Sequence, residues 1–538
     1  MEEHGKNEEL RKNEELRKNE ELRKNEELRK NEELRKNEEK IAATCRGGVQ
    51  ICHNAQQTAT SGLIFKELFL WEKSREGRCA ISIPTQDVEH SFLDPELTGD
   101  APELPQLGEL DIVRHYTRLS QWNFGVDSGM YPLGSCTMKY NPKINEVQAA
   151  RPGFSGAHPL LDEDMCQGAL EMMYNLEKYI AEITGMDAVT LQPAAGAHGE
   201  LAGMLAIHAY HAKKGRQRSK IIIPDTAHGT NPASATLCGY ESVNIHSGLD
   251  GILTPEAVAA VMDEETAGIM ITNPNTLGLF EENLKQIAQI VHAKGGLVYG
   301  DGANMNAIMG IVKPGELGID VIHLNLHKTF STPHGGGGPG SGPIAVVKAL
   351  EPFLPVPRVE KKDDHYTLVH DRPDSMGRLL TFHGHFGIMV RAYSYILSMG
   401  AKGLTDVSKL AVLNANYIKE SLKAYFHLPY DRPCMHECVF TDKFQSDNGV
   451  ITLDMAKRIM DYGFHPPTVY FPLVVHGSIM IEPTETESKE TIDQFIDAFK
   501  SVAQEAKDNP GILKSAPHLA KLSRLDEVSA ARKPVLRG

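Results

Sequence analysis

Long apolar runs are missing from this sequence. None approaches the roughly 20 consecutive apolar residues of a membrane-spanning helix, and Glu-rich sequence follows Met1 where a signal peptide would have its apolar core. Positive charge is also scarce, because 56 Lys and Arg stand against 71 Asp and Glu, a formal net charge of -15. Such a chain has no general electrostatic reason to bind nucleic acid or an anionic membrane. We therefore expect a soluble, cytoplasmic protein whose partners are small molecules and other proteins.

Cysteine is sparse as well. The eight cysteines of the 538 residues are scattered without paired zinc spacing, which favours reduced thiols over a disulfide framework. Only Cys434 and Cys438, with His436 between them, suggest a metal site. A four-coordinate site needs further ligands, and none is evident nearby in the sequence. We expect no metal.

The chain divides by composition into several parts. Residues 6–39 repeat Lys-Asn-Glu-Glu-Leu-Arg with a period of six, which fits neither a coiled-coil heptad nor a solenoid unit. We interpret residues 1–40 as a low-complexity tail and residues 41–130 as an N-terminal arm and lead-in. A large domain over residues 131–400, a smaller α+β domain over 401–510 and a tail over 511–538 complete the predicted organisation.

Short β-rich runs alternate with helical patterns through the large domain. The candidate strands are residues 188–192, 220–223, 242–245, 268–272, 296–299 and 321–324, and the helical segments include 167–184 and 282–294. This alternation predicts an α/β fold with a mainly parallel sheet covered by helices. Ligands of such a sheet bind at the carboxyl ends of its strands. A long helical stretch over residues 387–424 leads into the smaller domain.

Lys328 carries the strongest local signal. It follows an apolar strand in the run from His323 to Phe330, which also contains His327, and a glycine-rich segment follows over residues 333–340. A lysine in this position loses hydration, which favours the neutral amine that attacks a carbonyl carbon. We expect Lys328 to carry pyridoxal phosphate as a Schiff base, with His327 also contacting the cofactor. The glycine-rich segment lacks the Gly-Lys-Ser/Thr ending of a nucleotide-binding P-loop.

Asp301 stands at the end of the preceding candidate strand. A carboxylate beside a pyridine nitrogen keeps that nitrogen protonated, so that the ring can accept electrons from a developing carbanion. An isolated aspartate at a strand end is more often a cap or a turn residue. One βα step before Lys328, however, it has the position that a pyridoxal phosphate site requires.

Three more strand-end turns supply the rest of the expected cofactor site. Small residues at Ala195, Gly196 and Ala197 join a strand to a helix and suit a phosphate group, because helix N-termini expose free N–H groups. His228, in the turn over residues 227–233, offers an aromatic ring to stack on the cofactor. Asn275 and Thr276 add polar groups at another strand end, where we expect them to reach the cofactor's hydroxyl.

Together these motifs resemble one family. The residues that carry the resemblance are the loop over 131–143, the lysine and glycine-rich segment, the Asp301 strand end, His465-Pro466-Pro467-Thr468, Glu482-Pro483-Thr484-Glu485, and the terminal runs 525–528 and 531–534. In this order they are similar to the pyridoxal-dependent P-protein of the glycine cleavage system, in its separate subunit 2 form. The similarity extends over residues 63–536. His385 stands where this family more often has asparagine, and residues 66–71 look like a short insertion.

The resemblance implies a fold-type I enzyme of the pyridoxal phosphate class. Such a protein decarboxylates glycine, releases CO2 and transfers the aminomethyl group to the oxidised lipoyl arm of H-protein. It also implies a partner, glycine dehydrogenase subunit 1, with two copies of each subunit. His228, Asp301 and Lys328 are the catalytic residues expected on this basis.

Two other functions fit part of the sequence. One is a different fold-type I enzyme that decarboxylates a free amino acid without a lipoyl carrier. The other is a non-catalytic scaffold subunit that has kept the fold, and the presence of Lys328 and Asp301 speaks against it.

Overall fold

The computed structural model describes residues 67–536, apart from residues 86, 90, 92, 101 and 334–339. All described residues belong to one unit of the chain, Gln56–Gly538. The predicted low-complexity tail, Lys66 and most of the glycine-rich segment therefore lie outside the described residues.

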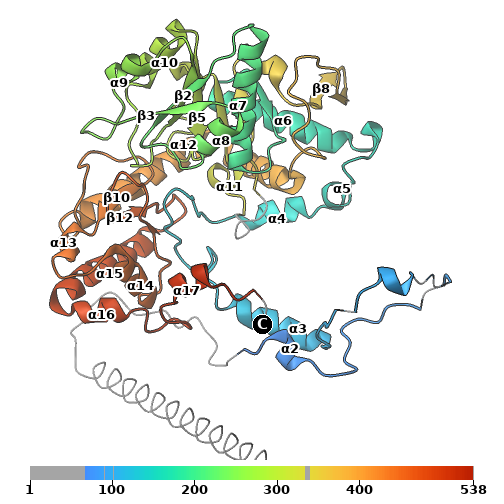
Figure 1. Ribbon diagram of the computed structural model, residues 1–538, viewed down its shortest axis with the longest axis vertical. Helices are drawn as coiled ribbons and strands as arrows, with labels where there is room; N and C mark the ends of the chain where they lie inside the picture. The colour runs from blue at the N-terminus through green and yellow to red at the C-terminus, as the bar shows by residue number, and fades with distance from the viewer. Residues whose placement is uncertain are drawn as a thin grey trace, which may run out of the picture. The chain divides into compact units, whose positions relative to one another are not determined.

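A seven-stranded sheet forms the centre of the large domain (Figure 1). Its order is β1-β7-β6-β5-β4-β2-β3, and the five strands β3, β2, β4, β5 and β6 run parallel to one another. β7 returns antiparallel between β6 and β1. The strands are β1 (Ala188–Thr190), β2 (Lys220–Pro224), β3 (Glu241–Ile245), β4 (Thr266–Thr272), β5 (Leu297–Gly302), β6 (Val321–Leu324) and β7 (Ile344–Val346). The sheet is mostly parallel, as predicted.

Alternate residues of each strand face different helices. Ile221, Met270 and Tyr299 pack with one cluster that includes helix α7 (Gly196–Lys213), whereas Ile222 and Val298 pack with a second cluster. That second cluster includes α6 (Gln167–Thr184), α10 (Leu284–Ala293) and the first part of α12 (Phe386–Leu422). The sheet is thus buried on both faces, which explains why its strands are continuously apolar.

Helix α6 shows how the sequence specifies these contacts. Leu170, Met173, Leu176 and Ile180 recur at helical spacing and form its buried face. Leu176 and Ile180 have no exposed surface, and burying such side chains stabilises the fold by about 1.5–3 kcal/mol each. The helix ends at Gly185, which has a left-handed φ of 70°.

All six predicted strands of the large domain are confirmed, with small changes in their ends. β5 extends to Gly302, so Asp301 lies within the strand, and β1 ends at Thr190. The prediction missed β7, which has only three residues, and the hairpin of β8 (Arg358–Lys362) and β9 (His365–Val369). These elements lack the βα alternation that identified the others. The remaining short helices of the domain are α8 (Asn231–Leu237), α9 (Pro255–Val261), η3 (Pro314–Leu317), α11 (Leu326–Thr329) and η4 (Glu351–Phe353).

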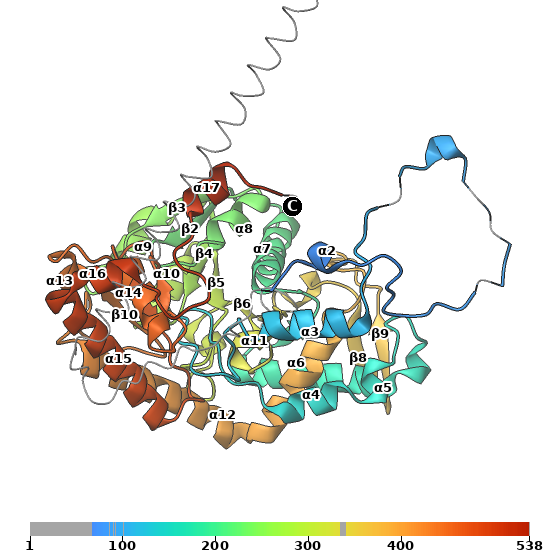
Figure 2. The same cartoon turned by 90° about the horizontal axis from the view of Figure 1, so that it is seen from below.

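A smaller α+β domain follows α12, as predicted. Gly400 interrupts α12 with a φ of 62° and a ψ of 177°. The small sheet has the order β10-β12-β11 and is antiparallel. Its elements are β10 (Cys438–Thr441), α13 (Lys443–Ser446), α14 (Thr452–Asp461), β11 (Thr468–Val469), β12 (Ser478–Ile481), α15 (Lys489–Asp508) and α16 (Pro510–Ser515). Figures 1 and 2 show these orange and red elements grouped beside the large sheet.

Short elements precede and follow the two domains. They are α2 (Leu70–Lys73), η1 (Pro95–Leu97), α3 (Glu109–Ser120), α4 (Lys143–Ala149), α5 (Pro152–Ser155), η2 (Glu163–Met165) and, near the C-terminus, α17 (Glu527–Arg532). The loop between α3 and α4 reaches the small domain, because Leu133 forms a β-bridge with Ile481. No helix in the described part of the chain combines the length and apolar character that crossing a bilayer requires.

Candidate active site

A cavity of about 180 Å³ lies at the carboxyl ends of β4, β5 and β6. Residues of the large domain, of the loop between α3 and α4 and of the small domain all line it. They are Ser135, Gly196, Ala197, Glu200, His228, Thr230, Thr272, Pro274, Asn275, Thr276, Asp301, Ala303, Asn304, His323, Asn325, Lys328, His436 and Glu437. The cavity therefore has the position predicted for a ligand of a parallel sheet.

Lys328 enters this cavity from α11, one short turn after β6. Its side chain is buried, with 8% of the residue exposed, and Nζ donates a hydrogen bond to the carbonyl oxygen of Ser135 at 2.6 Å. Ser135 has a left-handed φ of 64°. The Ser135 N–H in turn donates to Oε2 of Glu437 at 2.8 Å. The amine of Lys328 is thus held by a residue nearly 200 positions earlier in the chain.

Asp301 lies across the cavity on β5 and is also buried. Its Oδ1 lies 3.5 Å from Nε2 of His323 on the neighbouring strand. Nδ1 of His323 contacts the hydroxyl of Tyr299 at 2.5 Å. Burial lowers the pKa of His323 to about 4, so this imidazole is neutral. The carboxyl group of Asp301 thus lies between a neutral imidazole and the cavity that it lines.

Glu200 faces Asp301 from the first turn of α7. Burial and the charge of Asp301 raise the pKa of Glu200 to about 7. The hydroxyls of Thr230 and Ser234 donate to its two oxygens at 2.5 and 3.2 Å. Thr230 also contacts Nδ1 of His228 at 2.9 Å. Glu200 and Thr230 therefore fix the position of the imidazole that was predicted to stack on the cofactor.

His228 lines the cavity with its ring edge-on to Phe471 of the small domain, at 5.9 Å between centroids. Burial lowers its pKa, which favours the uncharged ring. An uncharged aromatic ring can stack on a flat heteroaromatic ligand. The predicted role of His228 remains compatible with this position.

The N-terminus of α7 opens into the cavity through Gly196 and Ala197. No side chain caps this helix, so its first N–H groups are available to an anion. A Cβ atom on Gly196 would lie 2.6 Å from Oδ1 of Asn325, and that Oδ1 is buried without a partner among the described residues. Thr272, at the end of β4, likewise has a buried hydroxyl without a described partner. These groups fit a phosphorylated ligand with polar substituents.

Asn275 and Thr276 line the cavity, yet the protein itself engages their side chains. Asn275 donates to the carbonyl oxygen of Gly251 at 2.9 Å and to Glu281 at 2.8 Å. Thr276 donates to the carbonyl oxygen of Thr226 at 2.9 Å. In this arrangement the two side chains shape the turn after β4.

Two of the expected cofactor contacts do not line the cavity. Ala195 is the N-cap residue of α7, directly before Gly196. His327 is half-buried on α11, where its Nδ1 accepts a hydrogen bond from the Ser341 N–H at 3.4 Å. Their predicted cofactor contacts stay predictions.

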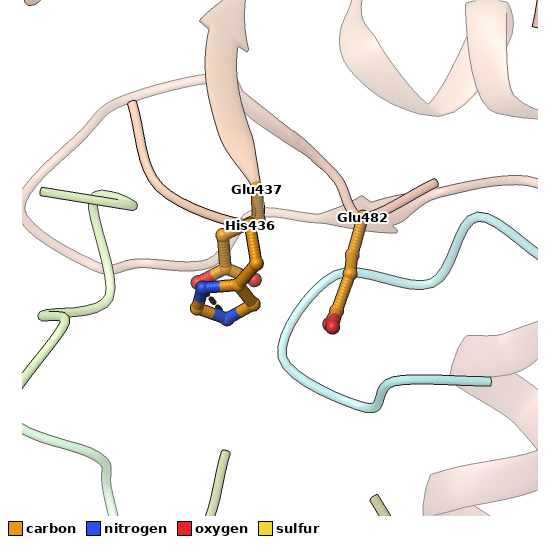
Figure 3. A group of neighbouring side chains, drawn as sticks. All are labelled: His436, Glu437 and Glu482. Atoms are coloured by element: carbon orange, nitrogen blue, oxygen red, sulfur yellow. Dashed lines mark ion pairs between the residues drawn. The ribbon is translucent and has the colours of Figure 1, made fainter. Parts of the chain in front are cut away.

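Sequence reasoning gave no role to the part of the cavity that the small domain supplies. His436, Glu437 and Glu482 are buried, and their ligand-type atoms all lie within 4.8 Å of one another (Figure 3). Burial and the charge of Glu482 raise the pKa of Glu437 to about 8. His436 and Glu482 each lay in a segment that the sequence had singled out. No sequence pattern, however, indicates that the two residues lie close together.

The cysteines beside His436 do not join this group. Among the described residues, His436, Glu437 and Glu482 are the one set of three or more His, Cys, Asp or Glu whose atoms lie close enough for a shared ion. Cys434 and Cys438 are buried free thiols, and burial raises the pKa of each. The suggested pattern of Cys434, His436 and Cys438 is therefore not gathered into one site.

A buried lysine connects the site to its support. Nζ of Lys139 donates to Asn306 at 2.8 Å and to the carbonyl oxygen of Thr329 at 2.9 Å, and it forms an ion pair with Glu485 at 3.0 Å. Thr329 directly follows Lys328 in α11. The ammonium group of Lys139 thus links the loop over 131–143 to the turn that bears Lys328 and to the small domain.

Two family models match the chain. The model described as "Glycine cleavage system P-protein" matches residues 100–365, and the model described as "Glycine dehydrogenase, C-terminal domain" matches residues 407–518. Two similar curated proteins share the name "Probable glycine dehydrogenase (decarboxylating) subunit 2". The protein from Caldanaerobacter subterraneus is 57% identical over 474 residues, which are 87% of this chain and 98% of that protein. The protein from Bacillus licheniformis has the same identity and coverage.

Solved structures share the fold at lower identity. An inhibitor-bound glycine decarboxylase (P-protein) of the glycine cleavage system superposes with a TM-score of 0.65 at 20% identity, covering 76% of this chain and 93% of that one. A glutamate decarboxylase from Lactobacillus brevis superposes with a TM-score of 0.59 at 14% identity, covering 80% and 96%. At these identities the likeness concerns the fold alone.

Proposed function

The chain belongs to the glycine cleavage system P-protein family, in its subunit 2 form, and we propose that it decarboxylates glycine with pyridoxal phosphate held on Lys328. The observation that carries this function is the placement of Lys328 and Asp301 in one cavity at the carboxyl ends of the parallel strands. The remaining aminomethyl group passes to the oxidised lipoyl arm of H-protein.

When bound, pyridoxal phosphate supplies an electron sink that accepts the electron pair left by CO2. The residues of the chain prepare the cavity for it. Lys328 provides the amine that holds the cofactor, and Asp301 holds a proton on the ring nitrogen. The open N-terminus of α7 at Gly196 and Ala197 receives the phosphate, and the ring of His228 packs on the cofactor.

Pyridoxal phosphate fits the donor set of the cavity. A buried amine, a buried carboxylate and an uncapped helix N-terminus match its aldehyde, its ring nitrogen and its phosphate respectively. Asn325 and Thr272 offer unpartnered polar atoms for its remaining substituents, among the described residues.

The subunit 2 identity of the relatives supports a partner subunit. We propose that this partner is glycine dehydrogenase subunit 1, with two copies of each chain, and that lipoylated H-protein docks on the assembled enzyme. The cavity already contains residues of both domains of this chain, so the partner is expected to complete the substrate side of the site.

The cofactor assignment is tested by absorbance. The chain reconstituted with pyridoxal phosphate should show a visible absorbance band that borohydride bleaches while it labels Lys328. Lys328→Ala should lose both the band and the label, whereas the exposed Lys313→Ala, whose side chain pairs with Glu182 on the surface, should keep them. A band that persists in Lys328→Ala would refute the assignment.

The reaction is tested by isotope exchange. With subunit 1 and lipoylated H-protein, the carboxyl group of glycine should exchange with labelled bicarbonate. Exchange that is equally fast without any lipoyl carrier would indicate a decarboxylase that acts on the free amino acid. A chain that binds the cofactor and shows no exchange under any condition would indicate a scaffold subunit.

A further inference from the structure

Glu437 is a buried carboxyl group that lines the active-site cavity and has no assigned role. It precedes β10 of the small domain and is 3% exposed. Oε2 accepts the hydrogen bond from the Ser135 N–H, and Ser135 also accepts the hydrogen bond from Lys328. Glu437 is therefore linked to the amine of Lys328 through hydrogen bonds to a single residue, Ser135.

Glu437 itself lines the cavity. Its other oxygen, Oε1, lies 3.9 Å from Nε2 of His436. Figure 3 shows the imidazole of His436 beside this carboxyl group, with the carboxyl group of Glu482 opposite. A protonated Oε1 would therefore be able to donate its proton to a group that enters the cavity.

A bound cation does not explain this cluster. The oxygens of Glu482 already accept hydrogen bonds from the Thr137 N–H at 3.0 Å, the Thr137 hydroxyl at 2.7 Å and Asn304 at 2.9 Å. These three donors engage both oxygens of Glu482 within the protein. The adjacent charge of Glu482, together with burial, favours a proton on Glu437.

Charged and titratable groups approach Glu437 from every side. They are Glu482 after β12, Lys328 on α11, His436 before β10, Cys136 in the loop between α3 and α4, and the thiols of Cys434 and Cys438. Glu482 and burial favour the protonated carboxyl group, and Lys328 opposes them. Burial keeps His436 neutral by lowering its pKa, and it keeps the three thiols protonated by raising theirs.

We propose that Glu437 is the proton donor of the transfer step, and that Glu482 is the positioning residue that keeps it protonated. The proposal rests on the proposed function. The substrate carbon that has lost CO2 forms a bond to one sulfur of the lipoyl disulfide, using the electron pair that CO2 left behind. The S–S bond breaks, and its electrons go to the second sulfur. That sulfur takes the proton from Glu437, which gives a thiol and a carboxylate, and water returns a proton to Glu437.

Other side chains of the cavity suit this role less well. Both oxygens of Glu200 accept hydroxyl hydrogen bonds, from Thr230 and Ser234. Burial lowers the pKa of His228 and of His436, so these imidazoles carry no proton to give near neutral pH. Glu437 lines the cavity, has a raised pKa of about 8, and accepts a backbone N–H from Ser135 on Oε2.

The test uses the cofactor-loaded chain with subunit 1 and measures single-turnover transfer from glycine to lipoylated H-protein and to free lipoamide across pH 6–10. The wild-type rate should fall as pH rises through the titration of Glu437. Glu437→Gln can still accept the Ser135 hydrogen bond, so we expect it to bind glycine, seen as a change in cofactor absorbance. Its transfer to both acceptors should be about 10²–10⁴-fold slower and should lack the alkaline decline. Glu177→Gln, which changes a half-buried glutamate outside this cavity, should transfer like the wild type.

Glu482→Gln gives an independent readout. Removing its charge lowers the pKa of Glu437, so the alkaline decline of transfer should move to lower pH. If Glu437→Gln fails to hold the cofactor, the position of this decline decides the question. A decline that stays in place in Glu482→Gln, or wild-type transfer by Glu437→Gln, would overturn the proposal. Absence of transfer in the wild type itself would instead refute the proposed function.

Discussion

At the scale of single residues, the position of Lys328 depends on the left-handed backbone conformation of Ser135, which is unfavourable for residues other than glycine. Ser135 accepts the hydrogen bond from Lys328 while its own φ is 64°. A left-handed conformation costs an L-residue roughly 1–2 kcal/mol. The cost is greater for a β-branched residue, whereas glycine adopts this conformation freely. The carbonyl group that holds the cofactor lysine is thus sensitive to the side chain at position 135.

Replacing Ser135 should therefore change cofactor binding in a graded way. Ser135→Val should shift this carbonyl and weaken pyridoxal phosphate binding by about tenfold, equivalent to roughly 1.4 kcal/mol. Ser135→Gly should bind the cofactor as the wild type does, since glycine adopts a positive φ freely. Titration of the chain with the cofactor, followed by absorbance, measures the difference. Equal binding by both variants would show that the backbone conformation is unimportant.

Asp301 should act through its charge. Asp301→Asn keeps the shape of the side chain and removes the negative charge next to the ring nitrogen, so glycine exchange should fall by about 10²–10³-fold. The cofactor should still bind to Lys328, and the borohydride label reports this separately. Loss of the label together with activity would place the role of Asp301 in cofactor binding.

Lys328, Asp301 and His228 could be predicted from sequence because each follows or ends a strand with a recognisable pattern, and all three line the cavity. It gave no role to Glu437, which contacts Ser135 across 302 positions, or to Glu200, whose raised pKa arises from its three-dimensional neighbours. Composition and spacing carry no information on such distant pairs. The contacts expected of Ala195 and His327 were placed by proximity in sequence alone, and neither residue lines the cavity.

At the scale of elements, α7 depends on close contact between its first turn and the segment just before β7. A Cβ atom on Gly199 would lie 2.5 Å from the carbonyl oxygen of Gly342 and 3.1 Å from Cβ of His323. Only glycine allows this approach. The N-terminus of α7 can therefore take its position beside the cavity because residue 199 is glycine and has no side chain.

Gly199→Ala should displace this terminus. We expect a loss of stability of about 1–3 kcal/mol from overpacking and weaker binding of the cofactor's phosphate. Gly168→Ala is the matched control, because a Cβ at Gly168 meets nothing within 4 Å. Thermal unfolding with and without pyridoxal phosphate compares the two variants. A Gly199→Ala protein as stable as the Gly168→Ala protein would contradict the packing.

The parallel strands and the long helices were predictable because their periodicity is strong. β7 and the β8–β9 hairpin were not, because three residues or an isolated hairpin give little periodic signal. β7 is nevertheless the strand whose neighbour Gly342 limits α7. The effect of β7 on α7 depends on the position of this strand in the sheet, which the sequence does not indicate.

At the scale of the whole molecule, buried carboxyl groups make stability depend on pH. Burial raises the pKa of Glu177 to about 7, against an ordinary value of 4.5, although Arg358 opposes the rise from 3.3 Å. The folded chain therefore holds a proton on Glu177 that the unfolded chain releases between these two pH values. Stability from this residue is present below pH 4.5 and is lost as pH rises to about 7.

Glu177→Gln should remove this dependence. Between pH 4.5 and 7 the wild type should lose about 1–3 kcal/mol relative to the variant, measured by urea unfolding at each pH. The variant should therefore gain relative stability toward neutral pH. A difference between the two proteins that is constant with pH would show that Glu177 is ionised throughout the range.

The ion pair between Lys139 and Glu485 also sets an order of events during synthesis of the chain. The ribosome releases Lys139 early and Lys328 later, but Glu485 emerges only after roughly 150 more residues, about 10–30 s at ordinary rates. Glu437 and Glu482 emerge in the same interval. Until then Lys139 lacks its carboxylate partner, and the cavity lacks the wall that carries Glu437. Capture of the cofactor is thus a late event, which follows translation of the small domain.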